Sequence, residues 1–203
     1  MESFIEEFQG DHEKTSELVV TVDGPSGAGT GTLASFIAEE LGINCYSAGD
    51  FFRGIAADRD MTVEELGKVA DKQTDLKVDR RTLEKGLSEN CVIEARIPSR
   101  VLGTYSDLRI YLTADLEERA KRVSKDQEEG KRENEEKSDS LEEVKERIRK
   151  RDEENWRRYK DYYGIENTKD IYDVLIDNTE MTIDEQQEQV RKILERKFPE
   201  QLE

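Results

Sequence analysis

The sequence predicts one α/β domain built on a parallel β-sheet, and three observations support this prediction. Strand-sized apolar segments alternate with segments of helical periodicity, as in a parallel sheet covered by helices on both faces. The 203 residues suffice for one domain with its own core. A glycine-rich stretch at residues 24–32 lies directly between the first predicted strand and the first predicted helix.

The first predicted elements lead into and out of this glycine-rich stretch. Residues 17–22 are mostly apolar, which predicts a buried strand. The helix after the stretch has an apolar stripe at helical spacing from Leu33 to Leu41, and Gly42 is expected to end it. A second short strand is predicted at 43–46.

The later elements follow the same alternation. Residues 50–88 are expected to be mainly helical, with a capping box at 62–65. A long helix is predicted at about 140–163, and a final helix begins after Thr182 and ends before Pro199. Further strands are predicted at 90–94, 107–113 and 172–176, and Asp115 opens a helix after the second of these.

Two segments are expected to lack a fixed place in the core. Residues 124–140 contain no apolar side chain, so they cannot bury themselves and should form a mobile loop. Residues 1–16 are polar and acidic, and we expect disorder or a loosely docked helix there.

The composition excludes several classes of function. The chain has 32 basic and 49 acidic residues, a net charge of −17, which argues against nonspecific binding to nucleic acid or anionic membranes. No apolar run approaches the ~20 residues of a membrane span, and no signal peptide is recognisable. The two cysteines, Cys45 and Cys91, lie in apolar runs and are expected to be buried free thiols in a reducing cytoplasm.

The glycine-rich stretch predicts a phosphate-binding loop. Its residues are Gly24, Pro25, Ser26, Gly27, Ala28, Gly29, Thr30, Gly31 and Thr32. Glycines allow a tight turn whose N–H groups point at phosphate oxygens, and the helix N-terminus behind them adds partial positive charge. An ordinary glycine-rich turn is the alternative. Phosphate loops usually carry lysine where this chain has Thr30, so positive charge must come from other residues.

Arginines are the candidate sources of that charge, because phosphoryl transfer depends on neutralising phosphate oxygens. The candidates are Arg53 and Arg96 after predicted strands, Arg119 and Arg122 on one helix, and Arg151 and Arg158 on the long helix. Ligands of such sheets gather beyond the carboxyl ends of the strands, where Asp50 and Glu94 also fall. Glu94 could orient Mg²⁺ through water or only cap the next turn. The alternative for the helical arginines is pairing with glutamates on solvated faces.

These residues resemble a known family. The segment 22–33 is similar to the phosphate loop of bacterial cytidylate kinases, and the rest looks more like the archaeal-type cytidylate kinases. The matching segments occur in the expected order at 47–53, 61–67, 79–81, 92–96, 158–165 and 171–176. The resemblance covers roughly residues 17–195. Members of the archaeal-type group also carry threonine at the position of Thr30.

The resemblance implies a P-loop NTPase three-layer sandwich with a five-stranded parallel sheet. Within one domain, residues 17–49, 89–122 and 164–197 would form the core. Residues 50–88 would form a helical monophosphate-binding flap, and about 123–150 a lid. The lid is longer and more charged than expected, and Ala95 and Pro98 alter the usual surroundings of Arg96.

The implied activity is transfer of a phosphoryl group from ATP to CMP, with dCMP as a further acceptor, by a cytoplasmic monomer. ATP would lie on the loop with Mg²⁺ near Thr32 and Glu94. The implied acceptor residues are Arg53 and Arg96 for the phosphate, with Asp50 beside them, and Asp79 and Arg80 for the base. Arg119, Arg122, Arg151 and Arg158 would close over the transferred group. The rival interpretations are another acceptor (AMP, UMP or a small acid) and an ATP-binding regulatory protein with weak catalysis.

Overall fold

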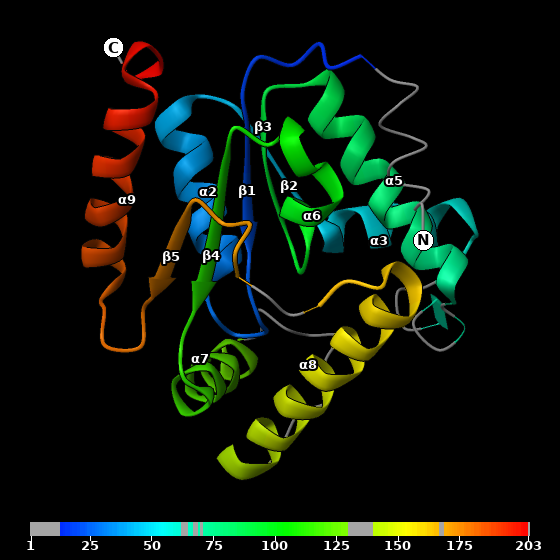
Figure 1. Cartoon of the computed structure of the whole chain (residues 1–203). Coiled ribbons are helices and arrows are strands. Elements are labelled where there is room, and N and C mark those ends of the chain that lie inside the picture. Colours follow the sequence, from blue (N-terminus) through cyan, green and yellow to red (C-terminus); the bar gives the residue numbers. More distant parts are fainter. Residues whose placement is uncertain are drawn as a thin grey trace.

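The computed structural model describes residues 13–61, 65–66, 69, 71–129, 140–166 and 169–202. A sheet of parallel strands with the order β2-β3-β1-β4-β5 forms its centre (Figure 1). The strands are β1 (Val19–Asp23), β2 (Asn44–Ser47), β3 (Cys91–Ala95), β4 (Leu108–Thr113) and β5 (Val174–Asp177). The predicted five-stranded parallel sheet is therefore confirmed, with strand bounds shifted by one or two residues.

Helices cover both faces of the sheet. On one face, α2 (Thr30–Leu41) and α9 (Ile183–Lys197) pack over a core that includes Val20 and Val22. On the other face, α5 (Lys72–Ser88) and α6 (Pro98–Leu102) pack over Val19 and Ile93. Alternate β1 side chains point to opposite faces, and all five β1 residues are buried, as expected of a central parallel strand.

Three further helices gather at the carboxyl ends of the strands. They are α3 (Ala48–Asp58), α7 (Leu116–Glu128) and α8 (Leu141–Tyr163). Figure 1 shows α7 and α8 beyond the arrowheads of β4 and β5. Helices α7 and α8 pack against each other through Ala120, Val123, Val144 and Ile148. Short 3-10 turns, η1 (Gly103–Tyr105) and η2 (Pro199–Gln201), complete the described elements.

The register of the sheet brings the predicted site segments together. Val22 pairs with Glu94 and Asp23 with Ala95, so β1 and β3 end side by side. On the other side of β1, Asp23 pairs with Tyr111. The glycine-rich loop that follows Asp23 therefore starts beside Glu94 and Arg96.

Two predictions from the sequence are wrong. Helix α7 runs to Glu128, so residues 124–128 are helical and not loop; they need no apolar side chain because they continue a helix that Val123 anchors, and Gln127 is itself buried. Cys45 is exposed because β2 is an edge strand, whereas Cys91 is buried as predicted. The short helix α6 was not predicted.

Some predictions lie outside the described residues. They are the loop at 130–139, most of the capping box at 62–65, and the conformation of residues 1–12. In the described part of the chain, no helix combines the length and apolarity that crossing a membrane requires.

Candidate active site

The glycine-rich loop is shaped by positions that only glycine can fill. Gly27 and Gly29 have φ angles of 81° and 90°, which disfavour residues with a side chain. A Cβ on Gly24 would lie 2.5 Å from the carbonyl oxygen of Leu112, and a Cβ on Gly27 would lie 2.7 Å from that of Arg119. The loop therefore fits closely against β4 and α7.

The N-terminus of α2 differs from those of the other long helices. The helices α3, α5, α7, α8 and α9 each have a side-chain N-cap and an acidic residue in the first turn. Helix α2 begins after Gly29 with no side-chain cap and no acidic residue in its first turn. Its first N–H groups and the positive end of its dipole fit the phosphates of a nucleotide.

A cavity of about 680 Å³ lies beside the loop. Its walls include four of the six predicted arginines, from α3, from the end of β3 and from α8. The predicted residues that line it are Pro25, Ser26, Gly27, Thr30, Arg53, Asp79, Glu94, Arg96, Arg151 and Arg158. The tertiary structure thus gathers guanidinium groups from distant segments around the loop.

Arg96 is held at the start of the loop. Its Nη1 donates a hydrogen bond of 2.9 Å to the carbonyl oxygen of Gly24. Burial, followed by the positive charge of Arg151, lowers the pKa of Arg96. Arg53, in contrast, is exposed and lies 2.5 Å from Asp50 on its own helix. Asp50 also closes the capping box with Ser47 at the start of α3, and it does not line the cavity.

Thr30 and Glu94 form a direct contact inside the cavity. The hydroxyl of Thr30, which stands at the usual lysine position, donates a hydrogen bond of 2.5 Å to Oε1 of Glu94. Thr30 is the first residue of α2 and is buried. The other predicted metal residue, Thr32, is exposed in the first turn of α2 and does not line this cavity.

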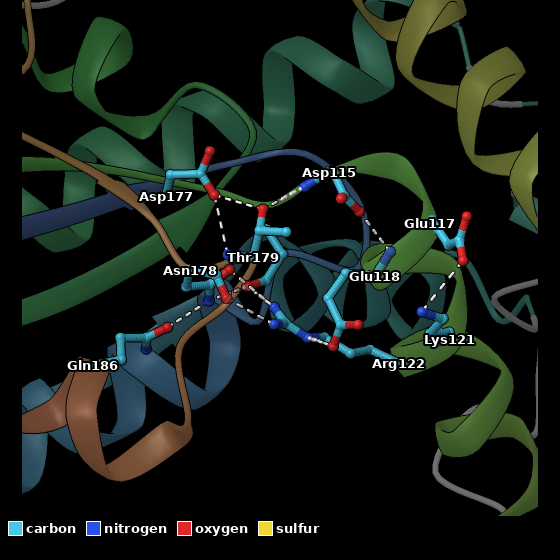
Figure 2. Close-up of polar contacts among 10 residues, drawn as sticks. Asp115, Glu117, Glu118, Lys121, Arg122, Asp177, Asn178, Thr179 and Gln186 are labelled. Atoms are coloured by element: carbon cyan, nitrogen blue, oxygen red, sulfur yellow. Dashed lines mark hydrogen bonds and ion pairs between the residues drawn. The ribbon is translucent and has the colours of Figure 1, made fainter.

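The arginines of α7 contact carbonyl oxygens of the loop. Arg119 donates to the carbonyl oxygen of Ser26 at 3.1 Å and to Asp152 at 2.7 Å. Arg122 donates to Asn178 at 2.9 Å and to Glu118 at 3.1 Å, as Figure 2 shows. Asn178 in turn donates to the carbonyl oxygen of Ala28 at 3.0 Å. The two arginines therefore brace the loop, and neither lines the larger cavity.

A second cavity, of about 520 Å³, adjoins the first. Arg96, Asn155 and Tyr159 line both cavities. Arg119, Tyr111 and Trp156 belong to the second one only.

Two partly buried carboxyl groups, Asp75 and Asp79, also line the larger cavity. Asp79 accepts a hydrogen bond from the hydroxyl of Tyr163, and burial raises the pKa of Asp79 to about 7. Asp75 lies 3.0 Å from Nη1 of Arg158. The neighbour predicted to act with Asp79, Arg80, is exposed and lines neither cavity.

Several residues around the loop were missed in the sequence. Asp23 is fully buried directly before the loop, and Ser99 and Tyr172 donate hydrogen bonds to it. Its position between an apolar run and the first glycine of the loop is a sequence pattern from which Asp23 could have been predicted. Asp152 and Asn178 carry no such signal, because only the tertiary structure brings them to Ser26 and Ala28.

The side chains around the loop fit a magnesium ion that is held mainly by its nucleotide. Among the described residues, no group of three or more histidine, cysteine, aspartate or glutamate side chains could hold a metal. Mg²⁺ in kinases is usually bound by one or two carboxylates together with waters and phosphates. Glu94, beside the loop, is a carboxylate of this kind.

Comparisons with known proteins show the family of this chain. A family model described as an AAA domain matches residues 24–142. The cytidylate kinase of Ignicoccus hospitalis is 35% identical over 179 residues, covering 87% of this chain and 98% of that protein. The cytidylate kinase of Methanothrix thermoacetophila is 37% identical, covering 79% and 88%. That of Pyrococcus horikoshii is also 37% identical, covering 80% and 81%.

Solved structures share the fold at low sequence identity. An uncharacterized protein from Eubacterium ventriosum has a TM-score of 0.64 at 17% identity, covering 88% of this chain and 99% of its own. A shikimate kinase from Bacteroides thetaiotaomicron has a TM-score of 0.59 at 13% identity, covering 88% and 97%. These likenesses support the kinase-type P-loop fold. By its sequence matches, the chain belongs to the AAA-domain family of the matching model and to the archaeal-type cytidylate kinases.

Proposed function

We propose that this protein is an ATP-dependent CMP kinase, with dCMP as a further acceptor. The observation that carries the proposal is the cavity that the phosphate loop shares with Arg53, Arg96, Arg151 and Arg158. Two polyanionic nucleotides can approach a protein of net charge −17 only where positive charge is concentrated. The relatives named cytidylate kinase support CMP as the acceptor.

The loop residues 24–32 would hold the phosphates of ATP, and Arg119 and Arg122 donate hydrogen bonds to carbonyl oxygens of this loop. Arg53 and Arg96 would hold the phosphate of the acceptor. The transferred group would be neutralised by Arg119, Arg122, Arg151 and Arg158. A bound Mg²⁺, near Glu94 and Thr32, would neutralise charge on the phosphates of ATP.

The proposed reaction needs no covalent intermediate. An oxygen of the acceptor phosphate attacks the γ-phosphorus in line, and the bond from that phosphorus to the β,γ-bridging oxygen breaks. The products are ADP and a nucleoside diphosphate. The flap at 50–88 and the lid at about 123–150 would close over both nucleotides and exclude water, which suppresses ATP hydrolysis.

Asp79 is the proposed reader of the acceptor base. It lines the end of the cavity that lies between α5 and α8, and Tyr163 fixes one of its oxygens. A carboxyl oxygen can accept a hydrogen bond from the exocyclic amino group of cytosine, whereas uracil has a carbonyl oxygen there. Arg80 would act only at the rim because its side chain is exposed. We further infer a cytoplasmic monomer, a setting that suits the free thiols of Cys45 and Cys91.

A panel of acceptors tests this proposal. CMP, dCMP, UMP, AMP and shikimate are each supplied with ATP and Mg²⁺, and ADP release is followed at several salt concentrations. We expect kcat/KM for CMP to exceed that for UMP and AMP by at least about tenfold. A preference for another acceptor would replace CMP in the proposal, and ATP binding without turnover on any acceptor would contradict kinase activity.

A further inference from the structure

Thr30 occupies the position where phosphate loops usually carry lysine, but its side chain binds Glu94. The hydroxyl donates a 2.5 Å hydrogen bond to Oε1 of Glu94, and the residue is 7% exposed. A lysine at this position would extend to the phosphates. The side chain of Thr30 is short and its hydroxyl already bonds to Glu94, so we expect Thr30 to act on bound phosphates through Glu94.

The methyl group of Thr30 has a separate contact. A Cβ on Gly24 would lie 2.6 Å from Cγ2 of Thr30, which shows how closely the methyl group approaches the first glycine of the loop. The two branches of one side chain therefore face different partners. The methyl group packs on Gly24, at one end of the loop, and the hydroxyl reaches Glu94 on β3.

Glu94 is already brought near the loop by the sheet, because it pairs with Val22 in the register of β1 and β3. The sheet fixes only its backbone. A glutamate side chain has three rotatable bonds and loses conformational freedom when it must hold one position. The hydrogen bond from Thr30 restricts the carboxylate to the wall of the cavity.

The positive charge that a lysine would bring has another source at the same place. Arg96 donates to the carbonyl oxygen of Gly24 at 2.9 Å and lines both cavities. Threonine therefore binds Glu94 through its hydroxyl and adds no positive charge beside the carboxylate.

We propose that Thr30 is a positioning residue that fixes the carboxylate of Glu94 at the phosphate loop for the magnesium–nucleotide complex. This inference rests on the proposed function in one respect, the role of Glu94 toward Mg²⁺. The hydrogen bond itself is independent of that role. The two parts can therefore be tested separately.

The first test measures binding without turnover. Calorimetry follows the binding of a non-hydrolysable ATP analogue at increasing Mg²⁺ in wild type and in the variants Thr30→Val and Thr30→Ser. Valine keeps the shape without the hydroxyl, and serine keeps the hydroxyl without the methyl group. We expect Thr30→Val to raise the Mg²⁺ concentration for half-maximal binding about tenfold, as loss of an outer-shell partner does. Thr30→Ser should stay within about threefold of wild type.

The second test is a double-mutant cycle with Glu94→Gln. If Thr30 acts through Glu94, adding Thr30→Val to Glu94→Gln should change the Mg²⁺ dependence less than twofold. The matched control is Thr104→Val, an exposed threonine of η1 that lines neither cavity, and it should change nothing. Melting temperatures of all variants without ligand show whether each one folds.

The outcomes separate the two proposals. The positioning role would be overturned if the double variant showed the product of the two single-variant changes in Mg²⁺ dependence. It would also be overturned if Thr30→Ser weakened the Mg²⁺-dependent binding as much as Thr30→Val does. Binding of the analogue that does not depend on Mg²⁺ in wild type would overturn it as well. A wild-type protein that binds the analogue with Mg²⁺ but phosphorylates no monophosphate would contradict the proposed function and leave the Thr30–Glu94 cycle valid.

Discussion

The hydroxyl of Tyr172 donates a 2.9 Å hydrogen bond to Asp23, a carboxyl group with no solvent exposure directly before the phosphate loop. Tyr172 belongs to the segment that leads from α8 to β5. Ser99 of α6 donates to the other oxygen of Asp23 through its N–H, at 3.1 Å, and its hydroxyl, at 2.5 Å. The start of the loop is thus tied to two segments that are distant in sequence.

Removing one of these donors should destabilise the protein. Tyr172→Phe keeps the ring that packs on Tyr111, with centroids 4.9 Å apart, but leaves an oxygen of Asp23 without its partner. Loss of a partner to a buried polar group costs about 1–3 kcal/mol, so we expect the free energy of unfolding in urea to fall by that amount. An unchanged free energy would mean that the hydrogen bond contributes nothing to stability.

Two carboxyl groups with raised pKa values, Asp23 and Asp79, predict a dependence of stability on pH. Burial raises the pKa of Asp23 from 3.8 to about 7, and burial raises that of Asp79 to about 7 as well. In the folded protein these two carboxyl groups keep protons that they lose above pH 3.8 in the unfolded chain. The two groups therefore contribute their full stabilisation below pH 3.8, and this contribution is lost as the pH rises to about 7.

A rise in pKa from 3.8 to about 7 corresponds to at most about 4 kcal/mol of stability for each group. Unfolding in urea at several pH values between 4 and 8 measures it. Asp23→Asn and Asp79→Asn should each become more stable relative to wild type as the pH rises. The exposed Asp184→Asn serves as control and should run parallel to wild type. Parallel curves for Asp23→Asn would show that this carboxyl group is ionised throughout.

Arg96→Ala should separate turnover from ATP binding. Arg96 faces both cavities and is proposed to hold the acceptor phosphate, so we expect kcat to fall by about 10³-fold while the Kd for ATP changes less than about threefold. Steady-state kinetics and calorimetry give the two values. Arg109→Ala is the matched control, since Arg109 pairs with Asp173 at 3.0 Å and lines neither cavity. Equal losses of turnover and ATP binding would contradict the assignment.

Two glycines of the loop should respond in opposite ways to alanine. Gly27 has a φ of 81° and its Cβ would meet the carbonyl oxygen of Arg119 at 2.7 Å, so Gly27→Ala should destabilise the protein by about 1–3 kcal/mol and weaken ATP binding. A Cβ on Gly31 meets nothing within 4 Å in the first turn of α2. Gly31→Ala should raise the free energy of unfolding by about 0.5–1 kcal/mol. Urea unfolding compares the two, and equal effects would contradict this account of the loop.

The order of strands and helices could be predicted because each depends on residues close together in the chain. The apolar run before Gly24 and the stripe after it define β1 and α2 locally. Helix α7 was predicted too short, because residues 124–128 lack apolar side chains. Their helical backbone hydrogen bonds continue from the turn that Val123 anchors. The exposure of Cys45 could not be predicted, because an edge strand and a central strand have similar local sequences.

The sequence by itself determined the glycine-rich loop, the alternation of strands and helices, and the set of arginines that could serve the loop. Only the tertiary structure decided which arginines line the larger cavity and which, like Arg119 and Arg122, bond to carbonyl oxygens of the loop. It also decided the partners of Thr30 and Asp23, which are Glu94 and Tyr172. Backbone turns and helices arise from neighbouring residues, whereas side-chain contacts between distant segments depend on strand order and register, which no local pattern encodes.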